Sequence, residues 1–456
     1  MWSAFSDLSD ARVWAAGAIA LAYLIFTAYC LRPLWRRRAS AAQSRDTTLI
    51  AFASQTGFAQ QLASQTAQSL QAAGRAVRVA SFADLSPADL TSAERALFIV
   101  STTGEGDAPD PAAAFVRKVL DGEVPLARLR YGLLALGDRE YDNFCAFGHQ
   151  VDRWLQQQGA QALFDVIEVD NGDDGALRHW QHNLAFAFEA PDLPDWEAPT
   201  YDRWTLATRR CLNLGSAGDP CFHLELRPAP GVALAWNAGD IAEIDPFNSH
   251  ARGGERHPHR EYSIASLPED GSLHLLVRQM RRPGGELGLG SGWLTRDAAV
   301  GSDIFLRVRS NPNFHPPATD APLILIGNGT GIAGLRALLK ARTAAGRRRN
   351  WLLFGERNAE HDRFYETDLD HWRAAGSLAR LDLVYSRDQA ARRYVQHRLA
   401  ECAEELRRWV DDGAFIYVCG SLAGMAPGVH AALVGALGAE VVEALTMAGR
   451  YRRDVY

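Results

Sequence analysis

The sequence is 456 residues long, with 47% hydrophobic and 22% charged residues, which is usual for a globular protein of two or three domains. A formal net charge of −6 at pH 7 argues against nucleic acid as a partner and permits a basic one. The six cysteines are scattered without a CxxC pair, so they suggest neither a zinc site nor a dithiol, and they fit a reducing compartment.

Residues 13–31 form an uncharged run of 19 residues rich in Ala, Leu and Ile. As a helix this run would be roughly 28 Å long, enough to cross the hydrocarbon core of a membrane. Arginines at 32 and 36–38 follow the run, whereas Asp7 and Asp10 precede it. We therefore expect residues 1–45 to be a single-pass anchor in the cell inner membrane, with the catalytic domains in the cytoplasm. The alternative, a cleaved signal peptide, would have a basic segment before the run.

Residues 47–53 predict a buried strand, and a helical pattern starts near Ala59. The turn between them is rich in hydroxyls and contains a glycine, so it can present N–H and O–H donors to a phosphate. It has no lysine and is not a GxGxxG turn, which disfavours a nucleoside triphosphate and favours a flavin mononucleotide. This turn consists of Ser54, Gln55, Thr56, Gly57, Phe58 and Ala59.

Three further strands are expected at residues 96–100, 131–136 and 166–169, and each runs into a polar loop. In a doubly wound sheet the ligand binds at the carboxyl ends of the strands, where these loops gather. Tyr141, in the loop after the second of these strands, is placed to stack on a ring system.

The segments SQTGFA, STTGEGD and LGDREYDNFC resemble the flavodoxin-type FMN domain of the NADPH-dependent diflavin reductases, and the third is closest to the sulfite reductase flavoproteins. The resemblance implies that the first turn holds the FMN phosphate and that two later loops surround the isoalloxazine. Those loops consist of Ser101, Thr102, Thr103 and Gly104, and of Leu136, Gly137, Asp138, Arg139, Glu140, Tyr141, Asp142, Asn143, Phe144 and Cys145.

A proline-rich, acidic segment at residues 191–200 predicts a domain boundary. After it come short strands, expected at residues 221–226, 241–244, 261–265, 272–277 and 303–309. Glycine and proline interrupt them at short intervals, which indicates a small antiparallel barrel over residues 201–318.

Within this region, Arg260, Glu261, Tyr262 and Ser263 start a strand. The arginine can pair with a pyrophosphate, the tyrosine can lie against a ring, and the serine can bond a ring nitrogen. Together with the glycine-rich segment they resemble the FAD-binding pair of the ferredoxin-reductase fold, although that segment alone also fits a flexible hairpin. The remaining predicted FAD residues are Leu276, Val277, Arg278, Gly288, Leu289, Gly290 and Ser291.

One departure from the pattern of the family matters for the domain arrangement. Sulfite reductase flavoproteins and cytochrome reductases carry a helical connecting domain just before the Arg-x-Tyr-Ser strand, and residues 239–260 are too few to hold it. We therefore expect the two flavin domains to be placed differently, or to be related by the linker alone.

Residues 322–326 predict a strand that enters a glycine turn with Gly329 and Thr330 and then a helix, a unit that seats a pyrophosphate. A later strand, residues 381–385, leads to donors suited to the second phosphate that distinguishes NADPH from NADH. The alternative is a solvated basic loop. The resemblance assigns the 2′-phosphate to Ser386, Arg387, Arg392, Tyr394 and Gln396, with Arg393 and Val395 beside them.

Cys419 ends a strand expected at residues 415–420 and, from its type alone, reads as a buried small residue. The resemblance instead places it near the nicotinamide. It also implies that the C-terminal Tyr456 covers the FAD ring and that Ser263 and Asp454 assist hydride transfer. These four residues are the predicted catalytic set.

We thus expect an α/β protein: a flavodoxin-like doubly wound domain (46–190), a barrel for FAD (201–318) and an NADPH domain (319–456), behind a transmembrane helix. The resemblance implies electron flow from NADPH to FAD, then to FMN, then to a one-electron acceptor. That acceptor is a sulfite reductase haemoprotein, a membrane haem protein or a ferric chelate. Two alternatives stay open: a membrane-anchored flavin redox sensor, and a flavin reductase that uses FAD only.

Overall fold

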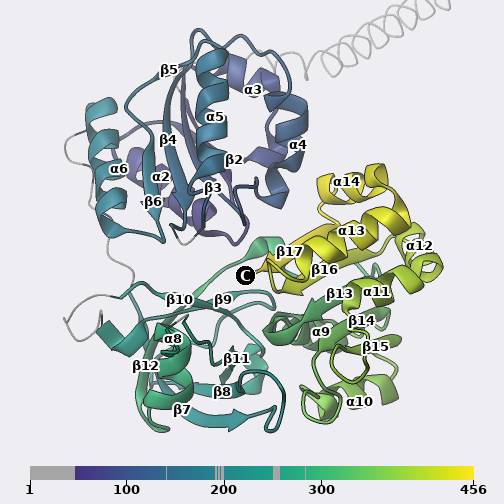
Figure 1. Ribbon diagram of the computed structural model, residues 1–456. Helices are drawn as coiled ribbons and strands as arrows, with labels where there is room; N and C mark the ends of the chain where they lie inside the picture. The colour runs from purple at the N-terminus through teal and green to yellow at the C-terminus, as the bar shows by residue number, and fades with distance from the viewer. Residues whose placement is uncertain are drawn as a thin grey trace, which may run out of the picture.

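The computed structural model describes residues 47–139, 141–190, 193, 196, 200–249, 257–282 and 284–456. The expected membrane segment at residues 13–31 and the predicted flavin residue Glu140 lie outside the described residues. Three sheets organise the described chain, and the C-terminus lies between the parts that they form (Figure 1).

The first sheet is parallel, with strand order β2-β1-β3-β4-β5 and with β6 also paired to β4. Successive residues of its central strand point to opposite faces: Phe98 belongs to the core that includes Phe115, and Ile99 to the core that includes Trp180. Helices therefore cover both faces, which is the doubly wound, flavodoxin-like arrangement that the sequence predicts. The elements are β1 (Thr48–Ala53), α2 (Phe58–Ala72), β2 (Val77–Ser81), α3 (Pro87–Ser92), β3 (Arg95–Ser101), α4 (Ala113–Phe115), β4 (Arg130–Gly137), α5 (Ala146–Gln157), β5 (Gln161–Ala162), β6 (Ile167–Asp170) and α6 (Asp174–Ala187).

The second sheet is antiparallel, with order β10-β9-β12-β7-β8-β11. Its inner face carries a core that includes Trp204, Leu224 and Ile304. The Ala265 N–H donates to the His274 carbonyl at 2.8 Å, which joins the end of β10 to the other edge strand and curls the sheet into a barrel. The elements are β7 (Asp202–Cys211), β8 (Cys221–Pro228), β9 (Ile241–Ile244), β10 (Arg260–Ser263), β11 (Leu273–Arg278), α8 (Leu289–Gly292) and β12 (Asp303–Arg309).

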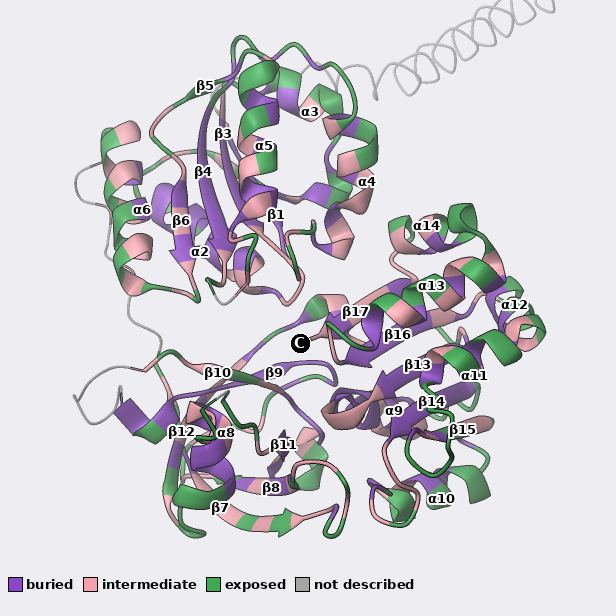
Figure 2. Cartoon of the chain, in the orientation of Figure 1, coloured by how far each residue is buried: buried purple, intermediate pink, exposed green. Residues whose placement is uncertain are grey.

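The third sheet is parallel, with order β15-β14-β13-β16-β17. Its inner strands read as continuous apolar runs because both of their faces are covered, and Figure 2 shows β13, β14 and β16 largely buried. The elements are β13 (Leu323–Asn328), α9 (Ile332–Ala344), β14 (Asn350–Glu356), α10 (Glu366–Ala374), β15 (Arg380–Tyr385), α11 (Val395–Glu401), α12 (Ala403–Asp411), β16 (Phe415–Gly420), α13 (Ala426–Leu437), α14 (Ala439–Met447) and β17 (Tyr451–Val455).

Among the described residues, no single helix has both the length and the apolar composition needed to cross a membrane. Taken together, α13 and α14 pass that test, but a bend of 114° separates them, and both contribute residues to the core against the third sheet.

Several strands of the structure have no counterpart among the predicted elements: β2, β5, β7, β14 and β17. The last reads Tyr-Arg-Arg-Asp-Val, a charged segment with no apolar run. It becomes a strand because β16 offers it a parallel partner, with Cys419 opposite Asp454. Pairing of this kind depends on tertiary context and not on local propensity.

Candidate active site

A cavity of about 1000 Å³, here named the central cavity, lies between the barrel and the third sheet. Its volume is at the upper end of the range for cofactor sites. Of the residues predicted to bind FAD or NADPH, Arg392 does not line it and is exposed. Those that line it are Arg260, Glu261, Tyr262, Ser263, Leu276, Val277, Arg278, Gly288, Leu289, Gly290, Ser291, Gly329, Thr330, Ser386, Arg387, Arg393, Tyr394, Val395, Gln396 and Tyr456.

The predicted catalytic residues meet at the inner end of this cavity: Ser263 and Tyr456 line it, whereas Cys419 and Asp454 lie behind the lining. The Ser263 hydroxyl on β10 donates to Asp454 Oδ2 on β17 at 3.0 Å, and the Cys419 thiol on β16 lies 3.8 Å from the same oxygen. All three side chains are buried, whereas Tyr456 is 51% exposed. The sheet register sets this geometry, because β16 and β17 pair Cys419 with Asp454.

Burial controls the protonation of this group. It raises the pKa of Asp454 to about 6, an effect that the hydrogen bond from Ser263 opposes. It also raises the pKa of the Cys419 thiol well above its usual value, and the Asp454 carboxylate adds to that shift. Asp454 can therefore hold or release a proton close to neutral pH, while Cys419 stays an uncharged thiol.

The arginines of the central cavity differ in their partners. Arg278 forms an ion pair with Glu356 and donates to the Asp219 carbonyl at 3.1 Å. Arg260 donates to the Pro258 and His259 carbonyls, and we find no carboxylate paired with it among the described residues. Its charge is therefore available for an anionic ligand.

Close packing explains two glycines of the predicted cofactor segments. A Cβ on Gly290 would lie 2.7 Å from Arg260 Cγ and 3.0 Å from the Tyr262 hydroxyl, so this residue lets α8 approach β10. A Cβ on Gly331 would lie 2.1 Å from the Cys419 carbonyl oxygen, so the glycine turn packs directly against β16.

The buried side-chain oxygen Oε1 of Gln396 has no hydrogen-bond partner in the described chain, which fits a ligand in the central cavity.

The turn predicted for the FMN phosphate has the features of an anion site. Gly57 precedes α2 with φ +89° and no side-chain cap, so the positive end of a 15-residue helix faces this turn. The hydroxyls of Ser54 and Thr103 are buried and have no hydrogen-bond partner in the described chain. Buried polar groups are rarely left unpaired, so both fit a bound flavin phosphate or ring.

The structure divides the other predicted FMN residues between several places. Phe58, Asp138 and Arg139 line a second cavity of about 1080 Å³, and Arg260 lines it too. The first predicted ring loop does not line this cavity; its residues are Ser101, Thr102, Thr103 and Gly104. Ala59, Leu136 and Cys145 have buried side chains in the core of the first domain. Tyr141 is half-buried and Asp142 is exposed, while Asn143 donates to the Glu105 carbonyl at 2.7 Å and joins the two flavin loops.

The predicted FMN turn packs against the barrel. Asn313 donates to the Ser54 carbonyl at 2.7 Å, and Arg309 donates to the Thr56 carbonyl. A Cβ on Gly57 would lie 2.4 Å from the Ser310 carbonyl oxygen. The two flavin parts therefore touch through these contacts in addition to the linker. Of the two expected alternatives, a relation through the linker alone is wrong.

The cavity lining includes residues that the sequence-based prediction of the site did not name. Among them are Glu356, which pairs with Arg278, and Asn328, whose Oδ1 accepts from the Ser421 N–H at 2.9 Å. Both lie at the carboxyl ends of strands, β14 and β13. The signal that could have found them is the rule that such ends carry the ligand site.

A flavodoxin-like sheet joined to a barrel and a second nucleotide fold, with a buried Ser–Asp–Cys group between them, defines an NADPH-dependent diflavin reductase that uses FMN and FAD. The chain belongs to the family of sulfite reductase [NADPH] flavoprotein alpha-components. A family model described as Flavodoxin matches residues 50–180, and one described as Oxidoreductase NAD-binding domain matches residues 325–431.

Three relatives illustrate the similarity. The alpha-component of Vibrio cholerae strain N16961 is 30% identical, over 92% of this chain and 88% of its own length. The alpha-component of Thiocapsa roseopersicina is 33% identical, over 84% of this chain and 83% of its own length. The alpha-component of Shewanella sp. MR-7 is 27% identical, over 91% of this chain and 91% of its own length. The first alignment spans 547 positions, more than the 456 residues of this chain, so that relative carries segments that this chain lacks.

Proposed function

We propose that the central cavity holds FAD and the nicotinamide nucleotide together. Arg260 pairs with the FAD pyrophosphate and Tyr262 lies against a ring. Ser386, Arg387, Arg392, Tyr394 and Gln396 receive the 2′-phosphate of NADPH. One observation carries this proposal: residues from β10, α8, β13 and the loop after β15 line one cavity, although the first and the last of these elements are more than a hundred positions apart in the sequence.

When bound, the cofactors supply two-electron chemistry at FAD and one-electron chemistry at FMN. The chain supplies orientation and proton control. The Ser263 hydroxyl faces the ring-binding end of the cavity and takes its direction from Asp454, which accepts its hydrogen bond. The neutral Cys419 thiol adds no second negative charge there. Tyr456 covers the FAD ring and moves aside for the nicotinamide, which its half-exposed position favours.

In the first domain, the hydroxyls of Ser54 and Thr103 and the start of α2 bind FMN, and Tyr141 stacks on its ring. The unpaired state of both hydroxyls supports this assignment. The contact of this edge with Asn313 and Arg309 brings the FMN turn to the barrel, which favours transfer from FAD to FMN.

We also propose that the electrons leave FMN for a haem or iron protein and that residues 13–31 anchor the chain in the inner membrane, with its domains in the cytoplasm. The relatives are named as alpha-components, which supports a partner component that takes the electrons. The anchor rests on the uncharged run and its flanking arginines alone.

The decisive experiment is flavin analysis of the detergent-solubilised full chain, followed by anaerobic titration with NADPH and, separately, NADH. We expect equal amounts of FMN and FAD, both reduced by NADPH and only slowly by NADH. FAD without FMN would contradict the relay. Reduction of a ferric chelate as fast as of a purified haemoprotein partner would favour the chelate as acceptor.

A further inference from the structure

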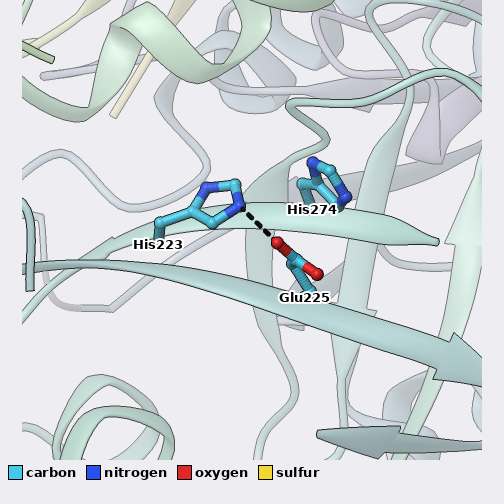
Figure 3. Close-up of side chains that lie close together, drawn as sticks. All are labelled: His223, Glu225 and His274. Atoms are coloured by element: carbon cyan, nitrogen blue, oxygen red, sulfur yellow. Dashed lines mark ion pairs between the residues drawn. The ribbon is translucent and has the colours of Figure 1, made fainter. Parts of the chain in front are cut away.

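Outside the central cavity, three side chains with metal-binding atoms gather on the barrel (Figure 3). His223 and Glu225 are two apart on β8 and so point to the same face of the sheet. His274 on β11 lies directly opposite Glu225 in the strand register. Each residue offers one ligand atom, and all three atoms lie within 4.8 Å of one another.

The distances come close to those of a coordination site. His223 Nε2 lies 3.6 Å from Glu225 Oε1, and the two imidazole rings have centroids 4.9 Å apart. In a tetrahedral zinc site the ligand atoms are about 3.4 Å apart, because each lies about 2.1 Å from the metal. No pair of ligand atoms has to close by more than about 1.4 Å, the difference between 4.8 Å and that spacing, and side-chain rotation supplies such a change.

Each histidine has one ring nitrogen within hydrogen-bonding distance of a hydroxyl, as metal-binding histidines commonly do. His223 Nδ1 lies 3.0 Å from the Tyr365 hydroxyl, which fixes the ring and leaves Nε2 for a metal. His274 Nε2 lies 2.9 Å from the Ser272 hydroxyl. The other nitrogen, Nδ1, is buried and has no partner among the described residues. Buried polar atoms are seldom left unpaired, so this nitrogen fits the role of a metal ligand.

The charges around the cluster permit a cation. Arg336, from α9, acts on the cluster, and Asp368 already pairs with it at 2.7 Å. Arg210 lies opposite His223 in the register of β7 and β8, but its side chain is exposed, so water and salt screen its charge. His223 is 5% exposed, whereas the Glu225 side chain is 32% exposed, so an ion can enter from the Glu225 side and keep one position open to water.

A second group of possible metal ligands lacks the free negative charge that a cation needs. Glu243, His259 and Glu261 also bring their ligand atoms within 4.8 Å of one another. However, Arg309 pairs with both of these carboxylates, and Arg307 pairs with Glu243 as well. The negative charge that a cation needs is therefore already neutralised.

We propose that His223, Glu225 and His274 form a site for one divalent transition-metal ion, with two imidazoles, one carboxylate and one open position. The ligand set suits Zn²⁺ and the neighbouring first-row metals. Tyr365 immediately precedes α10 and bonds His223, so an ion that fixes His223 would stiffen the boundary between the barrel and the third sheet. None of the three residues lines the central cavity, and the inference does not depend on the electron-transfer roles assigned above.

The test uses the full-length chain with its flavins, stripped of metal by a chelator and titrated with Zn²⁺ against a chromophoric chelator. We expect one ion per chain. Glu225→Gln and His274→Ala should each weaken its binding by more than about 100-fold, and Tyr365→Phe, which only removes the orientation of His223, by about 10-fold or more. His182→Ala, an exposed histidine on α6, is the matched control and should bind like the unaltered chain.

Equal affinity in the Glu225→Gln, His274→Ala and His182→Ala variants would overturn the proposal, and so would the absence of a zinc ion in the unaltered chain. Flavin content checks that each variant is folded. Should a variant lose its flavins, Co²⁺ bound to the unaltered chain decides: intense visible bands of a four-coordinate site support the proposal, and weak bands of a hydrated ion contradict it.

Discussion

Arg453 and Asp110 form an ion pair between the third sheet and the flavodoxin-like domain, with Arg453 Nε 3.0 Å from Asp110 Oδ1. The next residue along β17 is Asp454, the acceptor for Ser263. Gln55, in the predicted FMN turn, also donates to the Arg453 carbonyl, at 2.6 Å. A single strand therefore connects the docking of the first domain to the inner end of the central cavity.

Asp110→Asn should slow transfer from FAD to FMN without slowing reduction of FAD by NADPH. A largely buried charge-assisted pair is worth about 1.5–3 kcal/mol, so we expect the docked population to fall by about 10-fold to 100-fold. Stopped-flow absorbance separates the two steps. The control is Glu443→Gln, which breaks the exposed ion pair of Glu443 with Arg117 across the same boundary and should have little effect. A larger effect of the control would contradict the docking role of Asp110.

Asp454→Asn should stabilise the protein at pH 8 but not at pH 4. Burial raises the pKa of Asp454 from 3.8 to about 6, so the folded state binds more protons than the unfolded state between these values. The free energy of unfolding therefore falls as pH rises through that window and stays lower above it, by about 3 kcal/mol for this group. Asparagine is uncharged at every pH, so Asp454→Asn removes this loss of stability above about pH 6.

The measurement is the thermal unfolding midpoint of both proteins from pH 4 to pH 8. The difference in midpoint should be small at pH 4, grow up to about pH 6 and then level off. The exposed Asp121→Asn serves as the control. A difference that does not change with pH would mean that Asp454 is not the buried acid described here.

Arg387→Ala and Arg392→Ala should each weaken NADPH and leave NADH unchanged. In the proposed assignment each arginine forms a charge-assisted bond to the 2′-phosphate, so its removal should raise KM for NADPH by about 10-fold to 100-fold. Arg348→Ala, an exposed arginine after α9, is the control. Steady-state kinetics with both nucleotides checks this, and an equal loss for NADPH and NADH would place the 2′-phosphate elsewhere. The Arg392→Ala variant is the more stringent test of the assignment, because Arg392 does not line the central cavity.

Ser54→Ala and Thr103→Val should lower FMN affinity by about 10-fold each and leave FAD content unchanged. Neither hydroxyl has a partner in the described chain, so the flavin-free domain should not lose stability when it is removed. Fluorescence titration of FMN and thermal unfolding of the FMN-free protein give the two readouts. Ser64→Ala, on the exposed side of α2, controls for the loss of a hydroxyl. Lower stability with unchanged FMN affinity would assign both hydroxyls a structural role.

Local pattern was enough for much of the fold. Buried strands such as β1, β3 and β13 are continuous apolar runs, and the polar loops that follow them mark the ligand edge of the sheet. The predicted barrel strands agree with β8 to β12 to within about two residues, because alternation and frequent Gly and Pro are local signals. Short or charged strands such as β2 and β17 carry no such signal.

The sequence by itself determined which cofactor classes the chain is built to hold, because short motifs such as the hydroxyl-rich turn and Arg-x-Tyr-Ser carry their chemistry in adjacent residues. Only the tertiary structure decided where these motifs meet. The Ser263–Asp454 bond joins residues 191 positions apart, and Glu356 reaches Arg278 across the boundary of two domains. Such contacts depend on strand register and domain docking, which arise from the packing of the whole chain. The residues next to either partner in the sequence therefore carry no signal for them.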